Sequence, residues 1–218
     1  MRGLLKKDLY FISQQTRMFF VIGFLFVSFY FTKGIDSAPF VVSYTSMMGA
    51  ILALSTIGYD DYENSGAFLM TLPITRKEYV LEKYIFGVLC CILTWCFSTS
   101  IYLVLDFQEF TELLMMAAFV LITILAIEMV LIPIQLKFGT EKGRLALIGV
   151  FVMGMLLVTA VKKVIENNYI LEAKTGELMQ KLSALKPSVL LLMAVLLIGV
   201  EAYISYKSSV KILEKKEY

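Results

Sequence analysis

Long apolar runs separated by short charged segments dominate the pattern of this chain. A transmembrane helix needs about 20 largely apolar residues to cross the hydrocarbon core of a bilayer. We predict six membrane-spanning helices, at residues 18–35, 39–58, 85–105, 110–136, 145–161 and 189–206. The expected fold is therefore an all-α membrane protein with six transmembrane helices, and residues 1–218 form a single transmembrane domain.

Residues 1–17, ahead of the first span, have the spacing of an amphipathic helix. Their polar side includes Lys6, Lys7 and Arg17, and the opposite broad face carries Leu4, Leu5, Leu9, Phe11 and Ile12. Such a helix lies in the interface of an anionic inner leaflet. The simpler interpretation is a basic flank that only orients the first span, and the two interpretations are compatible.

A second amphipathic segment, residues 162–187, separates spans five and six. Leu178, Leu182 and Leu185 recur at helical spacing, which predicts a helix outside the membrane. We expect an extracellular helical loop. It either forms a lid over an exit path or rests on the lipid surface.

Composition and charge support the membrane assignment and set the orientation. Apolar residues make up 59% of the chain and charged residues 17%, against roughly 45–50% and about 25% in soluble domains. Fourteen of the 20 Lys and Arg residues fall on the side of the two termini and six on the other side. The positive-inside rule then places both termini in the cytoplasm, with the chain in the plasma membrane. A net charge of +2 gives no sign of nucleic-acid binding.

Several kinds of chemistry lack their residues in this sequence. The chain has no histidine, which removes histidine-based acid–base catalysis and His-ligated metal sites. It has no G-x-x-x-x-G-K-[ST] phosphate-binding loop, so we expect no nucleotide hydrolysis by this chain alone. Cys90, Cys91 and Cys96 all lie in the third span and are interpreted as small apolar fillers.

Two carboxylates fall inside predicted spans and are candidates for a pathway or gate. Glu128 lies near the middle of the fourth span, where an ionisable group costs roughly 2–3 kcal/mol unless protein or water surrounds it. It is either a pathway residue or a carboxyl that pins two helices together. Glu201 lies nearer the cytoplasmic end of span six and is either a second candidate or an interfacial charge. Pro133 is expected to bend the fourth span.

A charged segment, residues 60–75, separates the second and third runs. Its acidic residues precede an apolar patch, and the residues of interest are Asp60, Asp61, Glu63, Phe68, Leu69 and Leu72. Exposed apolar clusters usually mark a partner site, although this one could instead rest on the membrane surface. The acidic residues could pair with basic residues of that partner. We therefore hypothesise a docking surface on the cytoplasmic side.

The end of the same segment predicts a helix boundary. Pro73 ends any helix that reaches Leu72. Thr75 and Glu78 have the spacing of a capping box, so a new helix should begin at Arg76 and run directly into the third span. A short cytoplasmic helix joined in this way to a transmembrane helix could transmit force from a partner.

These residues carry a resemblance to a known family. The chain resembles the ABC-2 type permease family, and more closely the small six-span permeases of Gram-positive bacteria that include exporters of antimicrobial peptides. The resemblance spans the whole chain and rests on these residues: Tyr59-Asp60-Asp61, Phe68, Thr71-Leu72-Pro73-Ile74-Thr75-Arg76, Tyr79-Val80 and Lys83-Tyr84. The opening residues, Met1 to Leu9, fit the start of that family as well.

The resemblance implies the ABCG-like, type V permease fold and a subunit of an ABC exporter. Two permease chains would form the pathway in the lipid bilayer, with two ATPase subunits beneath them. The segment at residues 61–72 would be the coupling helix, and ATP and magnesium would bind the ATPase and not this chain. The cargo would be an amphipathic peptide or another amphiphile. The alternative is a secondary transporter or channel-like protein, which would need internal repeats and more intramembrane charges than the sequence offers.

Overall fold

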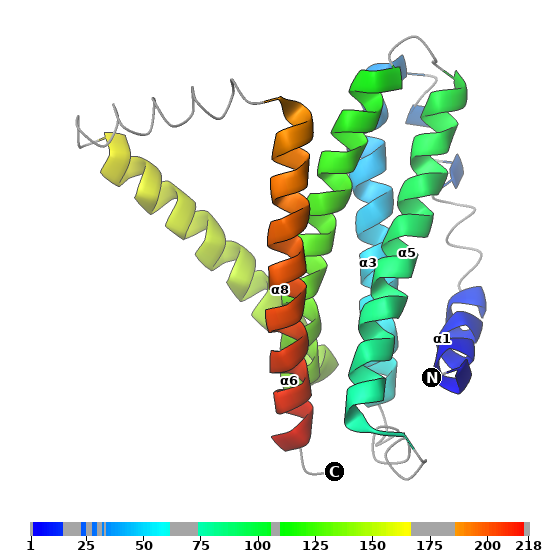
Figure 1. The fold of residues 1–218 in the computed structure, drawn as a ribbon, viewed down its shortest axis with the longest axis vertical. Helices are drawn as coiled ribbons and strands as arrows, with labels where there is room; N and C mark the ends of the chain where they lie inside the picture. Colours follow the sequence, from blue (N-terminus) through cyan, green and yellow to red (C-terminus); the bar gives the residue numbers. More distant parts are fainter. Residues whose placement is uncertain are drawn as a thin grey trace.

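The computed structural model describes residues 2–14, 23–24, 28–29, 32, 34–61, 74–105, 110–166 and 186–215. Within these ranges every regular element is a helix, as the sequence predicts (Figure 1). The elements are α1 (Arg2–Gln14), the short 3-10 helix η1 (Gly34–Ser37), α3 (Ala38–Asp61), α5 (Arg76–Leu105), α6 (Phe110–Glu166) and α8 (Pro187–Lys215).

Four described helices are long and apolar enough to cross a membrane. They are Ala38–Asp60, Arg76–Val104, Phe110–Gly139 and Pro187–Lys215, and they contain the predicted spans two, three, four and six. The predicted fifth span, 145–161, is helical within α6, and the predicted first span lies largely outside the described residues. The protein is thus a multi-pass membrane protein, and the count of six spans stays a prediction.

Two boundaries differ from those that the apolar runs predict. Residues 137–144, expected to form a loop, are helical apart from a break at Gly139, whose φ of 73° is in the left-handed region that favours glycine. The break therefore falls at Gly139, whereas Pro133 lies inside the helix and the bend expected there stays a prediction. The last helix, expected to end at Tyr206, continues to Lys215 because its polar end still packs a buried face that includes Leu213.

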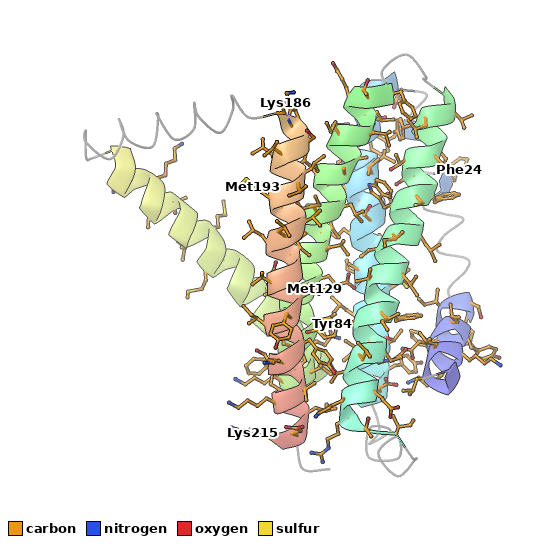
Figure 2. All side chains as sticks on the ribbon, in the orientation of Figure 1. Phe24, Tyr84, Met129, Lys186, Met193 and Lys215 are labelled. Atoms are coloured by element: carbon orange, nitrogen blue, oxygen red, sulfur yellow. The ribbon has the colours of Figure 1, made fainter. Side chains whose placement is uncertain are left out.

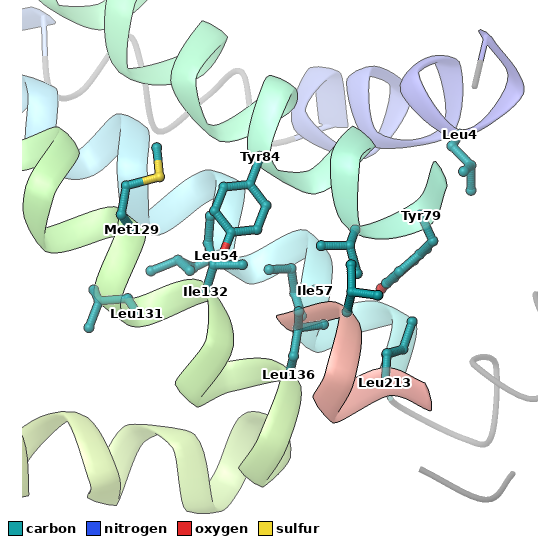
Figure 3. Packing of buried hydrophobic residues seen from close by; sticks show 12 residues of the cluster. Leu4, Leu54, Ile57, Tyr79, Tyr84, Met129, Leu131, Ile132, Leu136 and Leu213 are labelled. Carbon is teal, nitrogen blue, oxygen red and sulfur yellow. The ribbon is translucent and has the colours of Figure 1, made fainter. Parts of the chain in front are cut away.

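The helices form a bundle with α3 packed against both α5 and α6, and with α8 against α6 (Figure 1). Both termini lie toward the same end of the bundle in this view. Beyond Gly139, the second limb of α6 leaves the bundle at an angle. The largest apolar core lies at the end of the termini and joins all five α-helices (Figure 3). Its buried members are Leu4, Leu54, Ile57, Tyr79, Val80, Tyr84, Met129, Leu131, Ile132, Leu136, Val210 and Leu213.

Burial differs sharply between the central and the peripheral helix. The most apolar stretch of α3 is 56% buried, whereas that of α8 is only 6% buried. Figure 2 shows side chains along the outer edge of α8, Met193 among them, pointing away from the bundle. One face of α8 is held by polar contacts, because Tyr84 of α5 bonds with Ser205 and, at 2.8 Å, with Ser209. The exposed outer side chains of α8, such as Leu192, Leu196 and Val200, are free to meet lipid or another chain.

The predicted capping box at the start of α5 is confirmed. The Thr75 N–H donates to Glu78 Oε2 at 3.0 Å, and the Glu78 N–H donates to Thr75 Oγ1 at 3.2 Å. We expect Thr75→Ala to lower the free energy of unfolding by about 1 kcal/mol, because a backbone N–H at the helix start loses its acceptor. Thermal unfolding in detergent measures the change. Thr123→Ala is the control, since Thr123 is exposed and bonds only within its own helix turn. An equal loss in both variants would contradict the assignment.

Candidate functional site

Five charged residues gather at the end of the bundle where the termini lie. We call them the ion cluster: Lys7 and Asp8 from α1, Asp60 from α3, and Glu82 and Lys83 from α5. Lys83 is 2% exposed, and Asp8 and Glu82 are each 1% exposed. Buried charges of this kind persist only when they are paired, so the cluster must hold its three helices in a fixed arrangement.

Lys83 is the centre of the cluster. Its Nζ lies 2.8 Å from Asp60 Oδ2 and forms an ion pair with Asp8. The same ammonium donates to Thr56 Oγ1 at 3.2 Å. Three donors of one ammonium therefore reach two other helices, so Lys83 fastens both α1 and α3 to α5.

Asp60 is occupied within the chain. Its carboxylate pairs with Lys83 and Lys7, and Oδ2 accepts a hydrogen bond of 3.0 Å from the Tyr79 hydroxyl. Asp60 is only 7% exposed. In the described structure the charge of Asp60 is paired within the chain and stabilises the end of α3, immediately before the predicted coupling segment. A contact of Asp60 with basic residues of a partner stays a prediction.

Glu82 is the least satisfied member of the cluster. Its Oε2 lies 3.8 Å from Lys83 Nζ, and neither carboxylate oxygen has a hydrogen-bond partner among the described residues. The ion cluster thus contains three carboxylates, those of Asp8, Asp60 and Glu82, and two ammonium groups, those of Lys7 and Lys83. Within the same ranges, no group of three His, Cys, Asp or Glu side chains is arranged to hold a metal ion.

Of the other predicted coupling residues, the structure describes only the backbone of Asp61. Asp61 is the last residue of α3. Glu63, Phe68, Leu69 and Leu72 lie outside the described residues, and so does the short helix predicted there. Their role in coupling stays a prediction.

Both ends of that segment are nevertheless well anchored. On one side, Asp60 is fixed by the ion cluster. On the other, Ile74 packs against the main core and Thr75 caps α5. Arg76 then donates from its guanidinium to the Glu214 carbonyl of α8 at 2.7 Å. The described residues on either side of 62–73 are therefore tied to α1, α3, α5 and α8.

Glu128 of α6 is fully buried against α5, as the cost of exposing it to lipid predicts. Its Oε2 accepts a hydrogen bond of 3.1 Å from the Cys91 thiol, whereas Oε1 has no partner among the described residues. A Cβ on Gly87 would collide with this carboxylate, so the glycine makes room for it. Cys91 is thus more than an apolar filler. A pathway role for Glu128 stays a prediction.

Glu201 is only half-buried, and this contrast gives a test of the pathway role. We predict that Glu128→Leu lowers transport more than Glu201→Leu does. Leucine is close to glutamate in size and removes an unpartnered polar atom, so the fold should persist in both variants. Transport assays on equal amounts of inserted protein compare them. Equal and negligible effects would rule out a pathway role for Glu128.

Sequence analysis did not predict the ion cluster. It singled out neither Asp8 nor Glu82, named Lys7 only as part of a polar helix face, and named Lys83 only among the residues that carry the family resemblance. The available signal was the position of opposite charges, Asp8 and Lys83, next to apolar runs that must pack together. Without knowledge of which helix ends meet, that signal does not specify the pairs.

Comparison with known proteins places these features in context. The sequence pattern of the family described as ABC-2 family transporter protein matches residues 3–214. The match covers all the α-helices described above almost completely. No curated protein and no solved structure matches the chain.

Proposed function

The chain belongs to the ABC-2 family of transporter proteins, and we propose that it is the permease subunit of an ABC exporter. The observation that carries the proposal is the family match over residues 3–214 of a multi-pass helical protein. In this proposal a separate ATPase subunit binds ATP and magnesium and drives transport. Six spans, the type V fold and a plasma-membrane location with cytoplasmic termini are parts of the same proposal.

The anchored ends of residues 62–73 support a coupling role for that segment. A segment that receives force must pass it to the transmembrane helices, and a loosely attached loop would absorb it. Here one end is fixed by a buried ion cluster and the other by a helix cap and the Arg76 contact to α8. We infer that the ATPase binds the segment between these two anchors.

The exposed apolar faces support a second permease chain. Much of α8 is uncovered, with Leu192, Leu196 and Val200 each about 60% exposed. Three of the four described spans are 28%, 28% and 6% buried in one copy, which leaves large apolar faces for a second chain or for lipid. In the proposal two copies, or this chain and a related one, form the pathway in the bilayer. The apolar character of such a pathway suits an amphipathic peptide or another amphiphile as cargo.

Transport in vesicles tests the proposal. The chain is reconstituted with the ABC ATPase that co-purifies with it, and a fluorescently labelled amphipathic helical peptide serves as the probe. We expect ATP-dependent movement of the peptide with both subunits, and neither movement nor ATP hydrolysis above a detergent blank with the permease alone. Movement driven by an ion gradient without the ATPase would favour a secondary transporter instead.

A further inference from the structure

We propose that Lys83 is a positioning residue for ATPase coupling, and that it makes α1 part of the coupling element. The inference rests on the proposed function. Lys83 joins α1 and α3 through the ion cluster, at the point where the chain enters residues 62–73. The surface that the ATPase meets is therefore a unit of α1, the end of α3 and the start of α5.

The position of α1 shows why the N-terminal helix belongs to this unit. An amphipathic helix that only rests on the membrane surface should keep its charges in water and its apolar face in lipid. In α1 the buried positions are Leu4 and Asp8, one helix turn apart, and Asp8 points into the bundle toward Lys83. Leu9 and Tyr10 are instead 57% and 69% exposed. The buried charge of Asp8 therefore attaches α1 to the bundle.

Contacts around the ion pairs give α1 a defined register on α3. The rings of Phe11 and Tyr59 lie 4.3 Å apart between centroids. Lys7, one turn before Phe11, reaches Asp60, the residue after Tyr59. Leu4 extends the attachment into the main core. Apolar, aromatic and ionic contacts therefore fix α1 directly against the end of α3, where the chain enters residues 62–73.

The ion cluster should also be sensitive to the loss of a single member. Removing one partner of a buried ion pair leaves an uncompensated charge, whereas a surface pair contributes little. Loss of Lys83 would leave the half-exposed Lys7 as the one ammonium group of the ion cluster beside Asp8 and Asp60. The two aspartates would then repel each other, and α1 would separate from α3 while the membrane-spanning core remained in place.

The first arm of the test measures α1 docking without the ATPase. Cys90 and Cys96 are replaced by Ala and Cys91 by Ser, and Leu4→Cys, at a position 4% exposed, then reports α1 docking. A water-soluble maleimide is applied to membranes opened on both sides. We expect Lys83→Met and Asp8→Asn to raise the labelling rate about tenfold or more. The exposed Lys77→Met, in the same helix end, should leave it within about twofold.

The second arm measures the ATPase that a tagged full-length chain retains from membranes. Lys83→Met and Asp8→Asn should each retain at least about fivefold less ATPase than the wild type. Gly49→Ala is the structural control, because it strains the bundle within the membrane, away from the ion cluster. At a temperature where all variants are folded, Gly49→Ala should retain ATPase normally. Asp8→Asn keeps the experiment decisive if Lys83→Met fails to insert, since Lys83 then still pairs with Asp60.

Each outcome separates this inference from the proposed function. Faster labelling together with reduced ATPase retention supports it. Unchanged labelling in both variants overturns the claim that Lys83 holds α1. Faster labelling with normal retention overturns the claim that α1 belongs to the coupling element. If the wild-type chain retains no ATPase, both the proposed function and the positioning role of Lys83 are rejected. The labelling result then still decides whether the ion cluster holds α1 against the bundle.

Discussion

Replacing Phe68 by alanine is expected to weaken binding of the ATPase about 30-fold. Phe68 belongs to the apolar patch of the predicted coupling segment, on the side of the termini. Aromatic anchors of protein interfaces often contribute about 2 kcal/mol or more, and each 1.4 kcal/mol is tenfold in affinity. The protein should still insert and dimerise, because both ends of the segment are held by contacts that do not involve Phe68.

Quantitative retention of the ATPase by the tagged permease checks this expectation. Phe97→Ala is the matched control, since Phe97 is also an exposed phenylalanine but lies within the apolar part of α5. The double variant Asp61→Ala/Glu63→Ala tests the acidic flank. Asp60 is left intact because its loss would disturb the ion cluster. Normal binding and normal export in both Phe68→Ala and the double variant would refute the coupling assignment.

Gly49→Ala is expected to lower the free energy of unfolding by about 1–3 kcal/mol, the usual cost of overpacking a tight core. Gly49 lies where α3 approaches α5 closely. A Cβ at this position would lie 2.9 Å from the Cys90 carbonyl oxygen and would collide with the Thr94 side chain. The carbonyl belongs to the α5 backbone and cannot rotate away, so the two helices must separate. Chemical or thermal unfolding in detergent measures the loss.

Gly199→Ala provides the matched control for this experiment. Gly199 is in α8, and a Cβ there would meet nothing within 4 Å. Alanine favours a helix over glycine, so stability should be unchanged or slightly higher. Adding Thr94→Ala to Gly49→Ala removes the clash with the Thr94 side chain but not the clash with the Cys90 carbonyl oxygen. The double variant should therefore recover only part of the lost free energy of unfolding. Equal behaviour of Gly49→Ala and Gly199→Ala would show that the α3–α5 approach is not tight.

The sequence predicted the features that depend on nearby residues. The apolar runs at 39–58, 85–105, 110–136 and 189–206 all lie inside long helices, because the length of an apolar run is a local property. The capping box at Thr75 was equally accessible, since Thr75 and Glu78 are three residues apart. Burial of Glu128 followed from the cost of placing a carboxylate in lipid.

Features that depend on distant residues could not be predicted in this way. The ion pair between Asp8 and Lys83 joins residues 75 positions apart, and that between Lys7 and Asp60 joins residues 53 apart. Sequence reasoning offered Asp60 to a partner because nothing local shows that Lys83 reaches it. Likewise the thiol of Cys91 became a donor to Glu128 only when α5 and α6 were brought together.

The central claim is that this member of the ABC-2 family works as the permease of an ATPase-driven transporter. Native mass spectrometry of the tagged chain, purified from membranes of its own cells, which would also contain the cognate ATPase, tests the claim most directly. The account predicts a complex of two permease chains and two ATPase subunits, which loses the ATPase in the Phe68→Ala variant and keeps it in Phe97→Ala. A wild-type chain that is well folded and carries no ATPase would contradict the account.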